Sequence, residues 1–340
     1  MKLTLGLWLF LFIICGSVKA QFPIAPDVVY DFIKSNSIHR NRVDWGKIDN
    51  QFFSAISSAH NLQDTMKAFI GVLQALDDVH SQIYLNNQYY GYWHANEGPG
   101  ADRLSSLLKR ATETSGKVKC DLLENQFAYI RIPAMTAYGP DEVNRYAQML
   151  RDSVDRMSQM KVKGFILDLR LNTGGNMYPM LSGVGHLLGD GDIAYEVDLY
   201  DLVASTWKIE NGNFVINDFP VTHMDSALVK GLDEIPVVIL IGPITASSGS
   251  NIAIAFKTRK HTVFIGESTA AGYTTSNGYF QFAPNLVMNF AVNYVADSNL
   301  NLYPISVDPD IVIEGGDNFE KLYEDQKIKR ALLWLNGYTQ

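Results

Sequence analysis

Residues 164–176 read GFILDLRLNTGGN, and this stretch decides the fold. Residues 164–169 form an almost continuous apolar run, which is typical of a strand covered on both faces of a parallel sheet. The glycine pair Gly174 and Gly175 follows the run and precedes the next helical pattern. A buried strand that passes through a glycine turn into a helix predicts an α/β fold, in which ligands collect at the carboxyl ends of the strands.

The flanking residues extend this pattern on both sides. Residues 127–132 (FAYIRI) predict a strand, and Pro140 opens a helix whose apolar face continues to Met157. Strand, helix and strand in this order form a βαβ unit and predict a parallel sheet. The order repeats downstream with strands at 237–241 and 262–265 and a helix expected from Asn251. Alternating polar and apolar residues at 192–219 and 279–295 predict β-hairpins.

After the first twenty residues, the sequence suggests a division of the chain into three parts. Residues 26–78 repeat apolar side chains at helical spacing, so we expect a small helical N-terminal domain over residues 21–86. Residues 87–126 are rich in Gly, Asn and Tyr and predict a linker or flap with a weak helix near 104–110. The α/β core is expected over residues 127–340.

Residues 1–20 resemble a cleaved signal peptide. Lys2 precedes an apolar run over residues 3–14, and small residues precede the expected cleavage after Ala20. The run is shorter than the roughly 20 residues that a membrane anchor needs. A lipoprotein signal through Cys15 is an alternative, although Ile14 fits it poorly. We expect a secreted, periplasmic or extracellular protein with no membrane span.

Charge and cysteine content narrow the classes of partner. Without Lys2 and Lys19, 26 basic residues remain against 36 acidic ones, a net charge of −10. Nucleic acid and anionic membranes attract basic surfaces, so neither is expected as the main partner. Cys120 is the only thiol after position 20, and a packing role is expected for it. No cofactor or metal is expected, and the oligomeric state stays open.

A second loop, GPITASSGSN at residues 242–251, also lies between a predicted strand and a helix. A nucleophilic serine needs small neighbours, so that a substrate carbonyl can approach, and helix N–H groups near the developing oxyanion. The alternative is that the serines only cap the helix, with Ser250 or Asn251 as the capping residue. The amides of Gly174 and Gly175 could form an anion or oxyanion pocket, or the glycines could make an ordinary turn.

Together the two loops resemble the C-terminal processing, or tail-specific, serine peptidases. The resemblance also includes residues 266–269 (GEST) and 307–310 (VDPD), and it covers residues 127–312. It implies a Clp/crotonase-like core and a peptide or protein substrate. It also implies that Ser247 is the nucleophile, although alignment on the helix alone would allow Ser248. The loop of Gly174 and Gly175 corresponds to the oxyanion loop of the family.

The chain departs from the usual family pattern at the catalytic base. Residues 270–274 (AAGYT) lack the lysine of the Ser-Lys dyad. The tricorn branch of the superfamily instead pairs serine with histidine, in a segment that matches residues 77–81 (DDVHS), so His80 is the candidate base. The alternative is a histidine that only satisfies carbonyls at a helix end. With an ordinary histidine pKa, activity should fall below about pH 6.

Two further features of the family are not visible in the sequence. An acidic third member is not evident near the Pro-Asp motif, where Asn301 or Tyr303 lies. About 45 residues separate His80 from Phe127, too few for the PDZ domain of other family members. The incomplete triad keeps a second hypothesis open. The chain could be a non-catalytic carrier of apolar ligands or peptides, like the retinoid-binding proteins that share this core.

Overall fold

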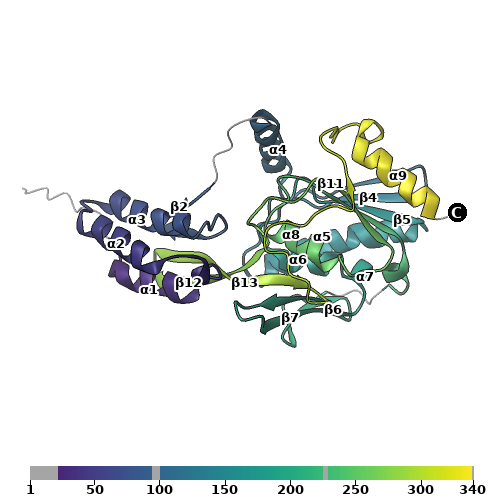
Figure 1. Ribbon diagram of the computed structural model, residues 1–340. Coiled ribbons are helices and arrows are strands. Elements are labelled where there is room, and N and C mark those ends of the chain that lie inside the picture. Colours follow the sequence, from purple (N-terminus) through teal and green to yellow (C-terminus); the bar gives the residue numbers. More distant parts are fainter. Residues whose placement is uncertain (1–21, 94–99, 225–228, 339–340) are drawn as a thin grey trace, which may run out of the picture.

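The computed structural model describes residues 22–93, 100–224 and 229–338, and the predicted signal peptide lies outside these ranges. Figure 1 shows a helical lobe built from the first three helices and a larger α/β lobe that contains the C-terminus. No helix in the described ranges is long and apolar enough to cross a membrane.

A six-stranded sheet forms the centre of the larger lobe, in the order β14-β11-β10-β5-β4-β3. All neighbours in it are parallel except β3 and β4. The strands are β3 (Lys119–Leu123), β4 (Phe127–Arg131), β5 (Gly164–Asp168), β10 (Val237–Ile241), β11 (Thr262–Gly266) and β14 (Ile311–Val312). Every residue of β4, β5 and β10 is buried, as the continuous apolar runs predict. The predicted mixed α/β fold is therefore confirmed.

Helices cover both faces of this sheet. One core cluster joins alternate sheet residues such as Ile130 and Leu167 to α5 (Gly139–Gln159), α6 (Met177–Gly183) and α8 (Ser248–Ala255). The other joins the intervening residues, such as Ile166 and Leu240, to α9 (Gln326–Tyr338). A short helix, α7 (Gly185–Leu188), follows α6. Burial on both faces explains why the strand sequences do not alternate.

Helix α8 starts earlier than predicted. It begins at Ser248 rather than Asn251, and all of its residues are buried. Serines are tolerated in its first turn because their hydroxyls have carbonyl partners there. Ser248 Oγ donates to the Gly175 carbonyl and Ser250 Oγ to that of Thr245. The expectation that Ser250 or Asn251 caps the helix is wrong, because the N-cap position is Ser247.

A second sheet connects the two lobes, in the order β2-β1-β13-β6-β7-β8-β9, with β12 also paired to β13. Its strands are β1 (Gln82–Leu85), β2 (Gln88–Gly91), β6 (Gly191–Val197), β7 (Val203–Glu210), β8 (Asn213–Ile216), β9 (Phe219–Pro220), β12 (Thr275–Ala283) and β13 (Leu286–Asp297). The predicted hairpins are present as β6-β7-β8 and β12-β13. The long strand β13 runs from the helical lobe into the core (Figure 1).

The helical lobe consists of α1 (Pro26–Asn36), α2 (Trp45–Ser57) and α3 (Leu62–Ala75). The side chains of Asp44 and Asn61 accept hydrogen bonds from the first turns of α2 and α3. The apolar faces of these helices pack on β1 and on the first part of β13. The predicted linker region contains β2, β3 and α4 (Ala101–Thr114), and α4 is longer than the weak helix expected there. Cys120 is a half-buried thiol on β3 that packs against the core.

Candidate active site

Ser247 occupies the tight turn between β10 and α8. Its φ and ψ are 52° and −122°, a conformation that residues with a side chain rarely adopt. Neighbouring hydrogen bonds hold the turn: Ser247 N–H donates to the Tyr273 carbonyl, and Ala246 N–H to that of Asn172. Such a backbone costs about 1–3 kcal/mol, and strain of this kind concentrates at functional sites.

The structure brings His80 to this serine. His80 Nε2 lies 2.9 Å from Ser247 Oγ, and His80 Nδ1 lies 2.7 Å from Thr275 Oγ1. The turn that carries His80 follows α3, and the Asp78 carboxylate accepts hydrogen bonds from the N–H groups of His80 and Ser81. The hydroxyl of Ser81 in turn accepts a hydrogen bond from Ala291 N–H on β13. The long connecting strand therefore anchors the histidine turn.

A closed set of hydrogen bonds fixes the tautomer of His80. The Thr275 hydroxyl donates to Asn277 Oδ1 at 3.0 Å, and Asn277 Nδ2 donates to the His80 carbonyl at 3.1 Å. Because the hydroxyl proton of Thr275 is used in this way, its oxygen accepts from His80 Nδ1–H. Nε2 is then unprotonated and can accept the proton of Ser247.

The third position in this arrangement is therefore neutral rather than acidic. Asn301 and Tyr303, which occupy the expected neighbourhood of an acidic partner, both donate instead to Asp297. Thr275 and Asn277, which lie on β12, were not predicted from the sequence. The available signal was their spacing: polar residues at i and i+2 of a strand lie on the same face.

Burial controls the charge state of His80. The residue is only 6% exposed, and this burial, aided by the nearby His39, lowers the pKa of His80 to about 4. The imidazole is therefore neutral well below pH 6. The expectation that activity falls below about pH 6 assumed an unperturbed pKa, and the transition moves toward pH 4.

The glycine loop lies directly against the serine. Gly174 and Gly175 have φ of 112° and 113°, and a Cβ built on Gly174 would lie 2.7 Å from Ser247 Cβ. Gly174 N–H donates to Asn172 Oδ1 at 2.9 Å, so it is not available to a ligand. Gly175 N–H, in contrast, has no acceptor among the described residues. Of the two predicted donors, only Gly175 has an amide without an acceptor in the described part of the chain.

Ser248, the alternative nucleophile, uses its hydroxyl elsewhere. Its Oγ donates to the Gly175 carbonyl at 2.7 Å. Its backbone N–H is one of the first in α8 and, like that of Gly175, has no acceptor within the described ranges. The contact between the two residues brings two unpaired amide groups into the same region beside Ser247. The sequence predicted Ser248 only as an alternative nucleophile and not through its amide.

A buried ionic network joins the end of β5 to Glu267 and to residues 317–327. Arg170, which follows β5, pairs with Asp168 and Asp325 at 2.7 Å each. Lys327 is fully buried and pairs with Asp317 and Glu267, so these carboxylates hold its ammonium group. Paired in this way, Lys327 does not take the place of the missing dyad lysine.

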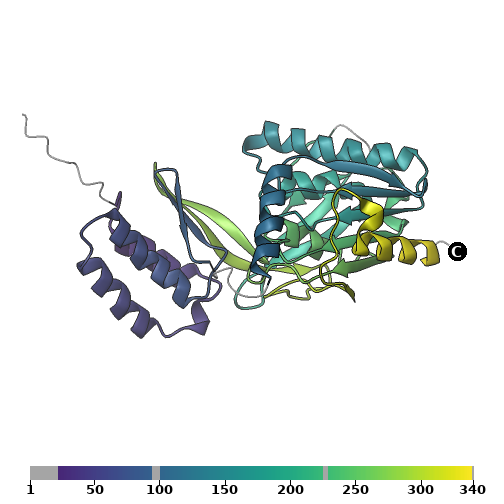
Figure 2. The same ribbon diagram turned by 90° about the horizontal axis from the view of Figure 1, so that it is seen from above.

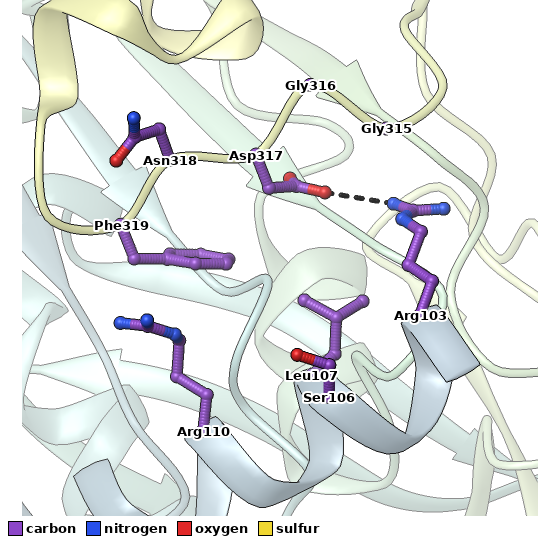
Figure 3. A pocket seen from close by; sticks show the side chains of 9 residues that line it. All are labelled: Arg103, Ser106, Leu107, Arg110, Gly315, Gly316, Asp317, Asn318 and Phe319. Carbon is purple, nitrogen blue, oxygen red and sulfur yellow. Dashed lines mark hydrogen bonds and ion pairs between the residues drawn. The ribbon is translucent and has the colours of Figure 1, made fainter. Parts of the chain in front are cut away.

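A cavity of about 410 Å³ lies on the outer side of this network, between α4 and residues 315–319. Figure 3 shows Arg103 reaching across it to Asp317, and Phe319 above Arg110. Arg103 also donates to Glu267 at 2.7 Å. Neither Ser247 nor His80 lines the cavity, so its residues dock α4 onto the core rather than form the chemical site.

Comparison with known proteins identifies relatives of the chain. The model of peptidase family S41 matches residues 126–313. The chain is 28% identical over 205 residues to the nisin-resistance protein of Lactococcus lactis subsp. lactis, covering 59% of this chain and 61% of that protein. It is 24% identical over 193 residues to a carboxy-terminal-processing protease of Bartonella bacilliformis, covering 56% and 40%. The chain thus spans less than two thirds of either relative.

Solved structures share the fold at lower sequence identity. A lipoprotein from Streptococcus agalactiae has a TM-score of 0.70 at 20% identity, covering 93% of this chain and 98% of that chain. The photosystem II D1 C-terminal processing protease has a TM-score of 0.55 at 14% identity, covering 90% and 96%. The predicted resemblance to C-terminal processing peptidases is confirmed by these matches and by the family match.

Proposed function

We propose that the chain, which belongs to peptidase family S41, is an exported serine peptidase that cleaves peptide bonds through an acyl-enzyme at Ser247. The proposed catalytic residues are Ser247 and His80, with the amides of Gly175 and Ser248 as oxyanion donors. A cell-envelope or extracellular location is supported by the likeness to a lipoprotein and to a nisin-resistance protein. The substrate is a peptide or protein.

The distance of 2.9 Å between Ser247 Oγ and His80 Nε2 is the observation that carries the proposal. In the first half-reaction, Oγ attacks the carbonyl carbon while its proton moves to Nε2. The oxyanion that forms accepts hydrogen bonds from the two unpaired amides. His80 then donates the proton to the departing amine, and the C–N bond breaks. A water molecule, activated by the same nitrogen, hydrolyses the acyl-enzyme and restores Ser247.

A serine-directed fluorophosphonate probe tests this mechanism. The probe phosphonylates an activated serine hydroxyl, so the wild-type protein should be labelled at Ser247 and the Ser247→Ala variant should not. Ser248→Ala should still be labelled, because the hydroxyl of Ser248 bonds to a carbonyl and not to histidine. Peptide mapping by mass spectrometry locates the label. Absence of label on the folded wild-type protein would favour the non-catalytic carrier instead.

Thr275 is proposed as a positioning residue for His80. It is 1% exposed, and valine has nearly the same shape, so Thr275→Val should fold normally. The variant leaves Nδ1–H without its acceptor, which costs about 1–3 kcal/mol. If the imidazole of His80 consequently leaves the orientation that accepts the serine proton, kcat should decrease about tenfold or more, with little change in KM. Thr275→Ser keeps the hydroxyl and should retain most activity. Equal activities of the valine and serine variants would contradict the role.

A further inference from the structure

A group of tyrosines lies on one face of the sheet near the helical lobe. Tyr84 of β1 stacks edge-on against Tyr89 of β2 at a ring-centroid distance of 4.4 Å, and Tyr279 of β12 lies 6.4 Å from Tyr84. Tyr138, which precedes α5 in the core, is added to this group because it is exposed and because its segment contacts the glycine loop. Burial, and to a smaller extent the nearby Tyr138, raises the pKa of Tyr84 and of Tyr279. We call these four residues the tyrosine cluster.

Three members of the cluster, Tyr84, Tyr89 and Tyr279, lie on the sheet face that the helices leave open. Alternate residues of the same strands, such as Ile83, Leu85 and Met288, are fully buried against α1, α2 and α3. Tyr279 and Tyr138 are instead 69% and 74% exposed. Figure 2 shows these strands extending from the core to the helical lobe. Several large rings that gather in solvent on one face are typical of a binding surface rather than of a core.

Two segments join the tyrosine cluster to the candidate active site. Strand β12 begins with Thr275, the partner of His80, and carries Tyr279 four residues further on. The segment before Tyr138 contacts the glycine loop, because Met135 N–H donates to the Gly174 carbonyl and Asn176 Nδ2 to the Ala137 carbonyl. The cluster is thus continuous with both the base and the oxyanion loop.

We propose that the tyrosine cluster is a subsite that holds an apolar or aromatic side chain of an extended peptide substrate, about four residues from the scissile bond. This inference rests on the proposed peptidase function and defines its substrate class. Four residues of strand span roughly 13 Å, and an extended substrate has the same rise per residue. A side chain about four positions from the scissile bond therefore reaches the rings when the scissile carbonyl is at Ser247.

The geometry of β12 also suits an extended peptide. Within the described ranges, β12 pairs only with β13, so the backbone groups along its other edge have no strand partner. A peptide can add to such an edge through main-chain hydrogen bonds, while its alternate side chains select the sequence. Tyrosine rings suit that selection because they are rigid, offer apolar faces and carry a polar hydroxyl at the rim.

Cleavage-site profiling tests the subsite. Wild-type protein and the variants Tyr279→Ala and Tyr138→Ala are incubated with peptides from a digest of β-casein and serum albumin, and the products are sequenced by mass spectrometry. The wild-type sites should be enriched in apolar residues about four positions from the cut. Both variants should lose that enrichment, and KM for a synthetic peptide with phenylalanine there should rise about tenfold at unchanged kcat.

Two controls make the result specific. Phe219→Ala removes another exposed ring, 74% exposed on β9, and should leave the profile unchanged. Tyr279→Phe keeps the ring and should keep the preference. A wild-type profile without an apolar preference at that distance, or one that survives in both alanine variants, would overturn the subsite while leaving the peptidase function intact.

A binding experiment separates the subsite from the catalytic proposal. Immobilised Ser247→Ala protein is incubated with the same digest, and the retained peptides are compared with those retained by the Ser247→Ala/Tyr279→Ala double variant. Selective retention of apolar peptides only when Tyr279 is present supports the subsite, even if the wild-type protein cleaves nothing and the peptidase function fails. Equal retention by the two proteins counts against the subsite.

Discussion

Replacing His80 by alanine should lower kcat by about three orders of magnitude, since general-base catalysis by a positioned side chain contributes roughly 10²–10⁴ in rate. The variant leaves Ser247 in place but removes the group that accepts its proton at 2.9 Å. Steady-state hydrolysis of a fluorogenic peptide measures the effect. His60→Ala, which removes an exposed histidine, should behave like the wild-type protein. Undiminished turnover of His80→Ala would refute the assignment of the base.

The pH profile gives His80 a second signature. Burial lowers its pKa to about 4, so the neutral form that can accept a proton dominates above that value. In the wild-type protein kcat/KM at pH 5–6 should therefore equal its value near neutral pH, and it should fall as the pH drops through about 4. The residual activity of His80→Ala should lack this step.

The same shift links His80 to stability. Between the unperturbed pKa of 6.5 and the folded value of about 4, the unfolded chain binds more protons than the folded one. Stability attributable to this residue is therefore present above about pH 6.5 and is lost as the pH falls toward 4. A pKa shift of this size changes the free energy of unfolding by roughly 3 kcal/mol between the two pH limits. Circular dichroism at each pH separates this loss of folded protein from the titration of the base.

Ser247 and the glycine pair, which the sequence proposed for the site, each lie in a local pattern with a chemical reason. Ser247 follows a buried strand in a run of small residues, and the glycine pair follows another. These patterns depend only on neighbouring residues in the chain, so they can be recognised from the sequence alone. His80 required the family resemblance, because a histidine after a helix has no distinctive local pattern of its own.

Thr275 was not predictable in the same way. It lies 195 residues from His80 in the chain, and its proposed role depends on a contact that only the folded chain creates, in which β12 is paired with β13. Threonine is also common in strands, so a threonine there does not by itself mark a functional position, and its spacing from Asn277 shows only that the two share a face. The lowered pKa of His80 could not be predicted from the sequence for a related reason. It depends on how much protein covers the imidazole, and burial is a property of the folded chain.

The different hydrogen bonding of the Gly174 and Gly175 amides could not be predicted from the sequence either. Both were predicted as oxyanion donors, and both need glycine for their positive φ. Which amide stays free depends on the side chain of Asn172, which accepts from the first glycine and leaves the second unpaired. Two adjacent glycines thus make different contacts in the fold. The first positions the loop against Ser247, and the second is the proposed donor.

Gly175→Ala should consequently abolish most activity and destabilise the fold together. Its φ of 113° is unfavourable for alanine, and the new Cβ would lie 2.2 Å from the Met135 carbonyl oxygen, so the loop must move. Losing one oxyanion donor lowers kcat about 10²–10³-fold. The backbone conformation and the overpacking should together reduce the free energy of unfolding by about 2–5 kcal/mol.

Gly191→Ala is the matched control for this variant. Gly191 has a φ of 132°, equally unfavourable for alanine, but a Cβ there would meet nothing within 4 Å. It should show only the backbone part of the destabilisation, about 1–3 kcal/mol, with kcat unchanged. Urea unfolding and peptide hydrolysis on both variants separate the two effects. A Gly175→Ala protein with wild-type kcat would show that this amide does not stabilise the oxyanion, because the displaced loop could no longer present it to the substrate.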